Sequence, residues 1–530
     1  MTARLPLMLG SALLAGALAL PTTAATAAPA TAAPATAAAR AAAPAAAGAT
    51  TTDGCLTSVP DPGTDEPVEI CWTLFRPAGA DRRARVPMIM HSHGWGGSRE
   101  TEASAFRDFL RRGYGVLSFD QRGFGESGGQ AQVMDPAHEG VDVRRLVRMV
   151  AGLRWVQQDA PGDPRLGAIG GSYGGGYQFV GAFEELRTRG TPVFDALAPE
   201  ITWHDLGQSL APEDVVRVEW AAALGAAAVP TDALPAGVYQ ALVEGAVIGS
   251  WPDGDGPLGT DIAAFMRDNG PRYQVAQGRR LDIPVLLGQG TTDSLFPLEQ
   301  GFRNWQRAIT PAARRDSIFV GYNGGHVLPA LFPRGIDVTS DPCSARLAGG
   351  DFRALSLRFF AEQLRGRDTG LRGYGRYHLA TRDSTCTTVR TVAADRAVPI
   401  RTVRTPTVVG PQVTTLVAPG PVRVAGTPYL TGDVTTPTPG SRAFYGLAVG
   451  TSAADATLVQ NNVLPLDEPA AVTDQRRRVD LPSVAVDVPR GQNLYLLSSP
   501  LSDTFVGMGG RVPGLVTIED GVVHLPVVGR

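Results

Sequence analysis

The sequence contains no lysine and only four cysteines, and both shortages narrow what the protein can be. Its basic residues are all arginines, and 48 of them against 51 acidic residues give a net charge of −3 at pH 7. This balance provides no basic surface of the kind that nucleic-acid-binding proteins need. We therefore expect no nucleic-acid partner.

Metal-binding motifs are also missing. No C-x-x-C spacing occurs, which argues against a zinc site. The run Asp253-Gly-Asp255-Gly256 resembles the start of a calcium loop, but Ala264 stands at the twelfth position, where such a loop needs glutamate. We expect neither a metal nor a cofactor.

The four cysteines form an even set, which fits an oxidising compartment. Pairing neighbours along the chain closes small loops and predicts the disulfides Cys55–Cys71 and Cys343–Cys386. Four cysteines nevertheless permit three connectivities.

The N-terminus has the pattern of an export signal. Arg4 precedes an apolar run from Leu5 to Leu20, and Ala25-Thr26-Ala27 provides small residues for cleavage. A membrane anchor is the alternative, but the apolar run is short and Pro21 follows it. We predict a cleaved signal peptide over 1–27, a disordered Ala/Pro/Thr-rich spacer over 28–50, and a secreted protein without membrane attachment.

From about residue 66 to 365, apolar strands alternate with amphipathic helices, which is typical of a mostly parallel α/β sheet, and we predict that this domain spans 51–385. The predicted strands are Val68–Phe75, Val86–His91, Gly115–Phe119, Leu166–Ile169, Ala196–Ala198, Ile283–Leu287 and Ser317–Val320. The predicted helices are Glu139–Gln158, Phe179–Leu186, Leu298–Ala308 and Phe352–Leu364.

Two regions depart from this alternation. Residues 203–275 are helix-prone and contain Trp203, Trp220 and Trp251, so we expect a cap over the catalytic face, with a peripheral helical excursion as the alternative. Residues 386–530 are rich in Val, Thr, Pro and Gly between turn signals, which predicts a separate β-sandwich.

Gly170-Gly-Ser172-Tyr173-Gly174 lies between an apolar strand and a helical pattern. Strand, Gly-x-Ser-x-Gly and helix are the context of a nucleophile elbow, in which a sharp turn exposes the serine hydroxyl. Glycine-rich turns also bind phosphates, so this motif needs partners before it indicates a serine nucleophile.

A serine nucleophile needs a base and an acid that orients it, and in this architecture they follow in the order Ser, Asp or Glu, His. His204, His326 and His378 follow the serine, and His326 stands in a loop with paired glycines just after a predicted strand. Asp293 ends the loop after Ile283–Leu287, with helix N-capping as its alternative role. We predict His326 as base and Asp293 as acid, with Glu200 and Asp205 as reserve acids.

The oxyanion formed during hydrolysis needs hydrogen-bond donors. The backbone N–H of Tyr173 is one, and the Trp95 N–H in the glycine-rich loop after an early strand is assigned as the second by position. His93 in that loop is expected to pack rather than to catalyse. The segment from Asp120 to Ser127 is expected to be scaffold, with an ion pair between Arg122 and Asp120.

The elbow with its following Gly-Gly-Tyr-Gln178, the Asp120-to-Ser127 segment, the helical insertion and the terminal β-region together resemble the Xaa-Pro dipeptidyl-peptidase and cocaine-esterase group of α/β-hydrolases. The resemblance implies an α/β-hydrolase fold with a helical cap, followed by a jelly roll. It places the triad on Ser172, Asp293 and His326. This chain has His93-Gly94-Trp95-Gly96 where cocaine-esterase-like members carry a Pro-Tyr element whose tyrosine helps form the oxyanion hole.

These features predict a secreted serine hydrolase that cleaves a small carboxylic ester or an Xaa-Pro-type peptide bond through an acyl-enzyme. The alternative is a non-catalytic extracellular binding protein with a relic hydrolase fold. A fluorophosphonate probe separates the two, because a relic serine does not react with it.

Overall fold

The computed structural model describes residues 48–255, 259, 261–327, 335–460 and 462–529. The predicted signal peptide and almost all of the predicted spacer lie outside the described residues. Among the described residues, no helix has the length and apolar character needed to cross a membrane.

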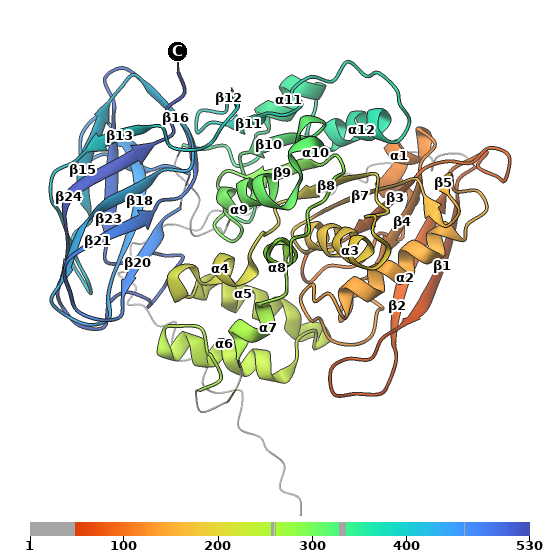
Figure 1. Cartoon of the computed structure of the whole chain (residues 1–530), viewed down its shortest axis with the longest axis horizontal. Helices are drawn as coiled ribbons and strands as arrows, with labels where there is room; N and C mark the ends of the chain where they lie inside the picture. Colours follow the sequence, from red (N-terminus) through yellow and green to blue (C-terminus); the bar gives the residue numbers. More distant parts are fainter. Residues whose placement is uncertain (1–47, 256–258, 260, 328–334, 461, 530) are drawn as a thin grey trace, which may run out of the picture. The chain divides into compact units, whose positions relative to one another are not determined.

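A ten-stranded mixed sheet forms the centre of the α/β region (Figure 1). Its strands, in spatial order, are β1 (Thr50–Ser58), β2 (Val68–Arg76), β4 (Gly115–Phe119), β3 (Met88–Ser92), β7 (Leu166–Gly171), β8 (Ala196–Glu200), β9 (Leu286–Gly290), β10 (Ile318–Tyr322), β11 (Tyr377–Ala380) and β12 (Cys386–Val389). The seven strands from β4 to β11 in this spatial order pair in parallel. Strands β1, β2 and β12 run antiparallel to their neighbours. The carboxyl ends of the parallel strands therefore meet at one edge, where their loops can converge.

Both faces of this sheet are apolar because helices cover both. Along β3, Met88 and Met90 belong to one core cluster and Ile89 to the other, as the alternation of a strand requires. The helices of this region are α1 (Arg107–Arg111), α2 (Glu139–Ala151), α3 (Tyr173–Arg189), α9 (Leu298–Arg303), α10 (Pro311–Arg315), α11 (Pro342–Ala348) and α12 (Phe352–Gln363), with a 3₁₀ turn at Ala103–Phe106.

The predicted helices Glu139–Gln158 and Phe179–Leu186 are wrong in extent, the second because α3 already begins at Tyr173 and continues to Arg189. The predicted helix Glu139–Gln158 ends at Ala151, because the following Gly152 closes it and the chain then returns to the sheet, where Val86 N donates to Trp155 O. The short strands β5 (Gln158–Ala160) and β6 (Asp163–Pro164) follow. The segment predicted as Leu298–Ala308 splits into α9 and a wider π-helical turn over Asn304–Ala308.

The disulfides are Cys55–Cys71 and Cys343–Cys386, the same pairs that neighbouring cysteines suggested. The first joins residues directly opposite each other on β1 and β2. The second joins α11 to β12. Together they fasten the first and last strands of the large sheet.

The insertion between β8 and β9 is helical, as predicted. It contains α4 (Leu206–Leu210), α5 (Val218–Ala228), α6 (Ala236–Ile248), α7 (Ile262–Met266) and α8 (Pro271–Ala276), with 3₁₀ turns at Pro212–Asp214 and Val229–Thr231. Helices α5 and α6 pack against each other, so closely that a Cβ on Gly225 would lie 3.1 Å from Leu242 Cδ1.

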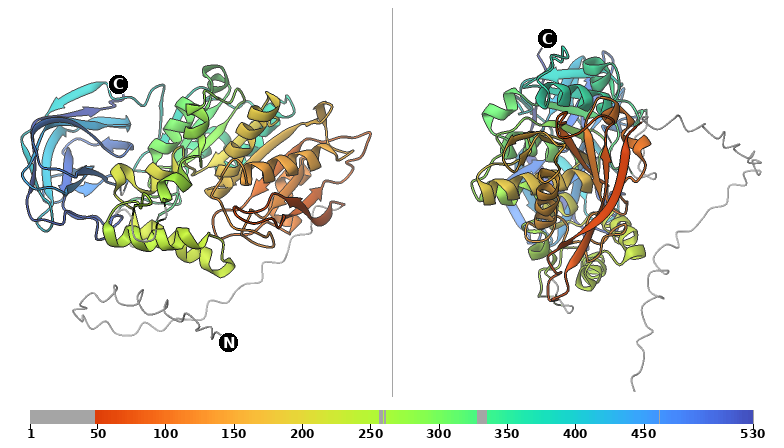
Figure 2. Two further views of the ribbon diagram at one scale, coloured as in Figure 1. Left: turned by 60° about the horizontal axis from the view of Figure 1, so that its bottom comes forward. Right: turned by 90° about the vertical axis from the view of Figure 1, so that its right-hand side faces the viewer.

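The C-terminal region is all-β, with antiparallel pairing throughout its named strands (Figure 2). One sheet contains β13 (Arg396–Pro399), β14 (Val403–Pro406), β17 (Tyr429–Thr436), β21 (Val472–Asp480) and β24 (Leu515–Leu525). A second contains β15 (Val413–Pro419), β18 (Ser441–Gly450), β19 (Thr457–Leu458), β20 (Leu464–Glu468) and β23 (Asn493–Ser499), and β16 (Val422–Gly426) pairs with β22 (Val484–Val488). Side chains from these sheets share one buried apolar cluster, which is the core expected of a sandwich. Because β12 belongs to the large sheet, the separate β-sheets begin at Arg396.

Candidate active site

Ser172 occupies the sharp turn between β7 and α3, with φ 58° and ψ −122°. This positive φ is strained for a residue with a side chain. A Cβ on Gly170 would lie 2.5 Å from Gly174 O, and a Cβ on Gly174 would lie 2.4 Å from Ser92 O. Backbone therefore fills the space on both sides of the turn, and this explains why both flanking positions are glycine.

Ser172, His326 and Asp293 form a continuous hydrogen-bonded chain. His326 Nε2 lies 2.8 Å from Ser172 Oγ, and His326 Nδ1 lies 2.8 Å from Asp293 Oδ2. Asp293 is 1% exposed, and its Oδ1 also accepts hydrogen bonds from the backbone N–H groups of Leu295 and Phe296. With its proton on Nδ1, the imidazole presents an unprotonated Nε2 to the serine hydroxyl, which is the geometry of a general base.

The loops after β9 and β10 bring the acid and the base together. Thr292 Oγ1 donates to Gly324 O at 2.7 Å and accepts from Gly324 N at 2.9 Å. A Cβ on Gly325 would lie 2.8 Å from Asp293 Cβ, at φ 102°. The paired glycines before His326 thus permit close contact between the two loops.

The other candidate histidines and acids lie in structural contacts. His204 Nδ1 is 3.0 Å from Asn304 Oδ1, and burial lowers the pKa of His204 to about 4. His378 contacts Gly373 O at 2.9 Å. Asp205 caps α4 and forms an ion pair with Arg272, whereas Glu200 accepts a hydrogen bond from the Tyr322 hydroxyl at 3.2 Å.

The loop after β3 approaches the nucleophile directly. A Cβ on Gly94 would lie 3.7 Å from Ser172 Cβ, and the Trp95 and Tyr173 rings meet edge to face at 4.9 Å. His93 holds this loop, since its Nε2 accepts from Gln121 N and its backbone O accepts from Gln121 Nε2. The backbone N–H groups of Trp95 and Tyr173 stay predicted oxyanion donors.

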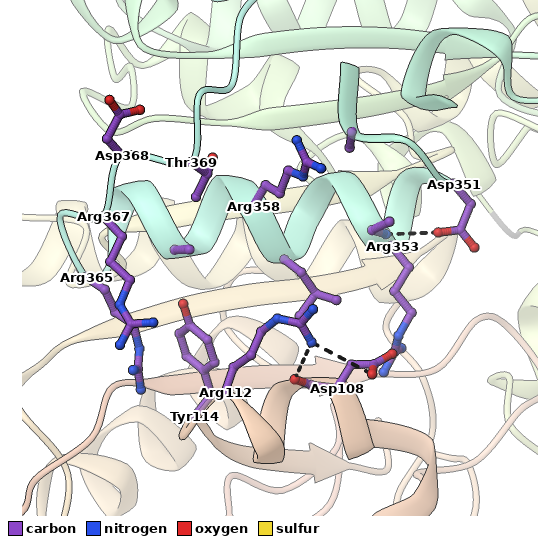
Figure 3. Close-up of a pocket in the computed structure, with 14 residues that line it drawn as sticks. Asp108, Arg112, Tyr114, Asp351, Arg353, Arg358, Arg365, Arg367, Asp368 and Thr369 are labelled. Atoms are coloured by element: carbon purple, nitrogen blue, oxygen red, sulfur yellow. Dashed lines mark hydrogen bonds and ion pairs between the residues drawn. The ribbon is translucent and has the colours of Figure 1, made fainter. Parts of the chain in front are cut away.

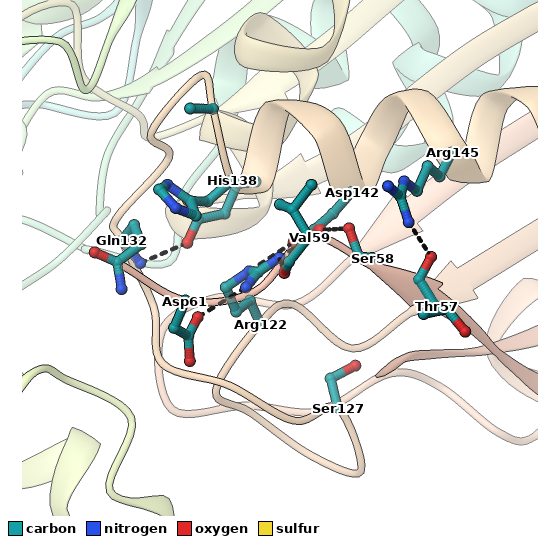
Figure 4. A network of polar contacts seen from close by, with 12 residues as sticks. Thr57, Ser58, Val59, Asp61, Arg122, Ser127, Gln132, His138, Asp142 and Arg145 are labelled. Carbon is teal, nitrogen blue, oxygen red and sulfur yellow. Dashed lines mark hydrogen bonds and ion pairs between the residues drawn. The ribbon is translucent and has the colours of Figure 1, made fainter. Parts of the chain in front are cut away.

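The segment after β4 contains a wrong prediction: Arg122 does not pair with Asp120. Arg122 is fully buried and binds Asp61 and Asp142, as Figure 4 shows. Asp120 instead pairs with Arg99 and accepts from Glu126 N. Asp120 and Arg122 therefore each find ionic partners 20 or more residues away in the sequence.

A narrow apolar pocket lies against Ser172 under the cap, with a cavity volume of about 60 Å³. Its lining comes from the nucleophile turn, the loop after β3, the cap and the loop after β9: Trp95, Val133, Ser172, Tyr173, Trp203, Leu206, Leu210, Ala221, Leu224, Gly225, Leu234, Val238, Leu242, Trp251, Phe265, Met266, Leu295 and Phe296. Of these residues, the sequence singled out only Ser172, Tyr173, Trp95 and the cap tryptophans Trp203 and Trp251. Trp203 and Trp251 line the pocket, and Trp220 packs edge to face on His326.

A larger pocket, of about 560 Å³, lies between α12 and the α1 region (Figure 3). Arginines dominate its polar lining, and we call it the arginine-lined pocket: Asp108, Arg112, Tyr114, Ala348, Asp351, Arg353, Ala354, Leu357, Arg358, Ala361, Arg365, Arg367, Asp368 and Thr369. None of the triad candidates lines it. Size alone would choose this pocket, but the candidate nucleophile Ser172 lines the smaller one, which is therefore the candidate reaction site.

In the described part of the chain, no group of three or more His, Cys, Asp or Glu side chains has the arrangement of a metal site.

Comparisons with known proteins agree with this geometry. Residues 65–327 match the family described as X-Pro dipeptidyl-peptidase (S15 family). Over 244 residues the chain is 27% identical to the quorum-quenching protein AidA of Acinetobacter baumannii, which covers 44% of this chain and 77% of that protein. It is 31% identical over 105 residues, 19% of this chain, to an uncharacterized 31.7 kDa protein of Escherichia coli, and spans only 35% of that relative's length.

Solved structures show the fold over most of the chain. A CocE/NonD family hydrolase from Staphylococcus aureus aligns with a TM-score of 0.59 at 12% identity, covering 90% of this chain and 97% of that one. An aminopeptidase from a Thaumarchaeota archaeon aligns with a TM-score of 0.62 at 12% identity, covering 90% and 96%. The resemblance predicted from sequence is confirmed: the protein is a hydrolase with the α/β-hydrolase fold, and its residues 65–327 match the X-Pro dipeptidyl-peptidase (S15) family.

Proposed function

We propose that the protein is an exported serine hydrolase that cleaves a carboxylic ester or an Xaa-Pro-type peptide bond through an acyl-enzyme on Ser172. The hydrogen-bonded chain from Ser172 Oγ through His326 to Asp293 carries this proposal. Nucleophilic catalysis requires a serine hydroxyl that is exposed on such a strained strand-to-helix turn and hydrogen-bonded to a base.

In the first half-reaction, Ser172 Oγ attacks the carbonyl carbon while His326 Nε2 takes the hydroxyl proton. The bond to the leaving group breaks as His326 returns that proton to the leaving oxygen or nitrogen. Water then attacks the acyl carbon while His326 accepts its proton. The bond from that carbon to Ser172 Oγ breaks, His326 returns the proton to Oγ, and the acid leaves. Asp293 holds the imidazole throughout, and the backbone N–H groups of Tyr173 and Trp95 stabilise the oxyanion.

A fluorophosphonate probe and the variant Ser172→Ala test the proposal. We expect the wild-type protein to be labelled and to hydrolyse p-nitrophenyl acetate, and the variant to lose both, with an activity loss of about 10⁴-fold or more. Ser98→Ala is the matched control, because Ser98 is exposed and lies in the loop after β3, whose Gly94 lies close to Ser172. Labelling and activity that survive in Ser172→Ala would contradict the assignment.

Export is the second part of the proposal. Two disulfides in the described chain fit an oxidising compartment. If the signal is cleaved, the protein recovered outside the cell begins after Ala27, which N-terminal sequencing detects. The relic-binding alternative is not favoured, because the chain is a hydrolase by family and its candidate triad is complete in geometry.

A further inference from the structure

We propose that the pocket against Ser172 is an acyl-binding pocket for a short, uncharged, apolar acyl group. The substrate is then an ester of such an acid rather than a peptide with a free N-terminal amine. The inference rests on the proposed function, since it assigns the substrate class of the same site.

The position of the pocket assigns it to the acyl side of the substrate. His326 protonates the leaving group, so the leaving group lies against the imidazole. Among the described residues, the pocket lining includes Ser172 and both predicted oxyanion residues, Tyr173 and Trp95, but not His326. The group that stays bound to Ser172 in the acyl-enzyme therefore occupies this pocket.

The lining leaves almost no polar atom available to a ligand. Trp95 Nε1 donates to Leu224 O at 2.9 Å, and Trp203 Nε1 donates to Asn269 O at 2.6 Å. The Tyr173 hydroxyl is directed to Glu139, 3.4 Å from its Oε1. Trp251 Nε1 is buried without a partner among the described atoms, and an N–H donor of this kind gives no site for a positive charge.

A free amine would need a carboxylate partner, because a buried ammonium without one is strongly unfavourable. No aspartate or glutamate lines the pocket among the described residues. Glu200 and Asp205, which lie just before the cap helix α4 in the sequence, contact Tyr322 and Arg272 instead. The wall therefore selects against a positively charged acyl group.

The size of the pocket limits the acyl chain. About 60 Å³ is far below the roughly 300–1,000 Å³ of pockets that bind drug-sized ligands. Leu242 on α6 packs against Gly225 of α5, and both line the cavity. We therefore expect these cap helices to set the upper limit on chain length.

The test compares p-nitrophenyl propionate with the p-nitrophenyl ester of alanine, which differs by an ammonium group on the same carbon skeleton. After subtraction of spontaneous hydrolysis, we expect kcat/KM for the propionate to exceed that for the alanine ester at least tenfold. In an acetyl-to-octanoyl series, we expect kcat/KM to fall at least tenfold from butyryl to octanoyl. An alanine ester hydrolysed as fast as the propionate, or a preference for octanoyl, would overturn the inference.

Variants of α6 locate the effect. Leu242→Glu should lower kcat/KM for the propionate at least tenfold and narrow the gap to the alanine ester, whereas Val243→Glu, at a 52% exposed neighbour, should change neither. Leu242→Ala, which buries no charge, should raise kcat/KM for octanoyl relative to butyryl at least threefold. Unchanged selectivity in both Leu242 variants would overturn the assignment of the wall.

Fluorophosphonate labelling separates the two levels. A wild-type protein that is not labelled refutes the proposed function itself. A labelled protein that prefers the alanine ester retains the serine mechanism and refutes only the acyl pocket.

Discussion

The pocket against Ser172 and the arginine-lined pocket differ in both size and chemistry. The first is about 60 Å³ and apolar; the second is about 560 Å³ and contains five arginines and three aspartates. The ends of the strands, and not the volumes of the pockets, indicate which pocket is the candidate reaction site. The loops after β7, β9 and β10 bring the candidate residues Ser172, Asp293 and His326 together, and Ser172 lines the small pocket, whereas none of the three lines the large one.

Asp293→Asn should give the largest effect on this comparison. The amide favours the wrong tautomer of His326, so we expect kcat on p-nitrophenyl acetate to fall about 10⁴-fold with a small change in Tm. Initial rates and thermal denaturation measure the two quantities.

The arginine-lined pocket provides the control for that variant. Arg358 lines it and is exposed, and Arg358→Ala should leave kcat/KM within about twofold, the range usual for surface changes. A tenfold loss of kcat/KM in Arg358→Ala would show that the arginine-lined pocket contributes to catalysis, against the separation of the two pockets.

Gly174→Ala should give the next largest effect, on stability as well as on rate. Alanine is normally the better helix former, by about 1 kcal/mol, yet here its Cβ would lie 2.4 Å from Ser92 O. We expect the free energy of unfolding to fall by about 3 kcal/mol, measured by urea denaturation. Gly207→Ala in α4, where the Cβ meets only an ordinary contact at 3.8 Å, should not destabilise the protein.

Glu200→Gln should act through pH, and it probes a carboxyl group next to the nucleophile turn. The backbone O of Glu200 accepts from Ser172 N, while its carboxyl group senses Asp351 and Arg353 of the arginine-lined pocket. Burial raises the pKa of Glu200 from 4.5 to about 7. Between these values the folded state keeps a proton that the unfolded state has released, so wild-type stability decreases as pH rises.

Glutamine does not titrate, so the stability of the variant relative to wild type should increase by about 3 kcal/mol from pH 4.5 to 7.5. Urea denaturation at several pH values measures this difference. A stability difference that stays constant over that range would show that the Glu200 carboxyl group titrates normally.

The sequence predicted the structure well where local patterns decide it. The Gly-x-Ser-x-Gly turn and the glycines before His326 are local requirements, and both loops have the geometry that those residues imply. The catalytic roles of Ser172, Asp293 and His326 stay predictions.

Partners set by tertiary structure were out of reach. Arg122 was assigned to Asp120, two residues away, but binds Asp61 and Asp142. The pocket wall was missed for the same reason, because α4 to α7 are apolar on several faces and only packing decides which residues face Ser172. The end of α2 was missed because Leu153 and Val156 continue a helical spacing after Gly152 has closed the helix.

The turn after Asp293 connects the proposed catalytic acid with the wall of the proposed acyl pocket. The same carboxylate that contacts His326 also accepts from the N–H groups of Leu295 and Phe296, whose side chains form part of the pocket wall. Evolution or engineering that resizes the pocket at these two positions would disturb the acid at the same time. Helix α5 is coupled to the candidate base as well, because its Trp220 packs on His326. We therefore expect new substrate ranges to be acquired most readily at Leu242 of α6, which packs against Gly225.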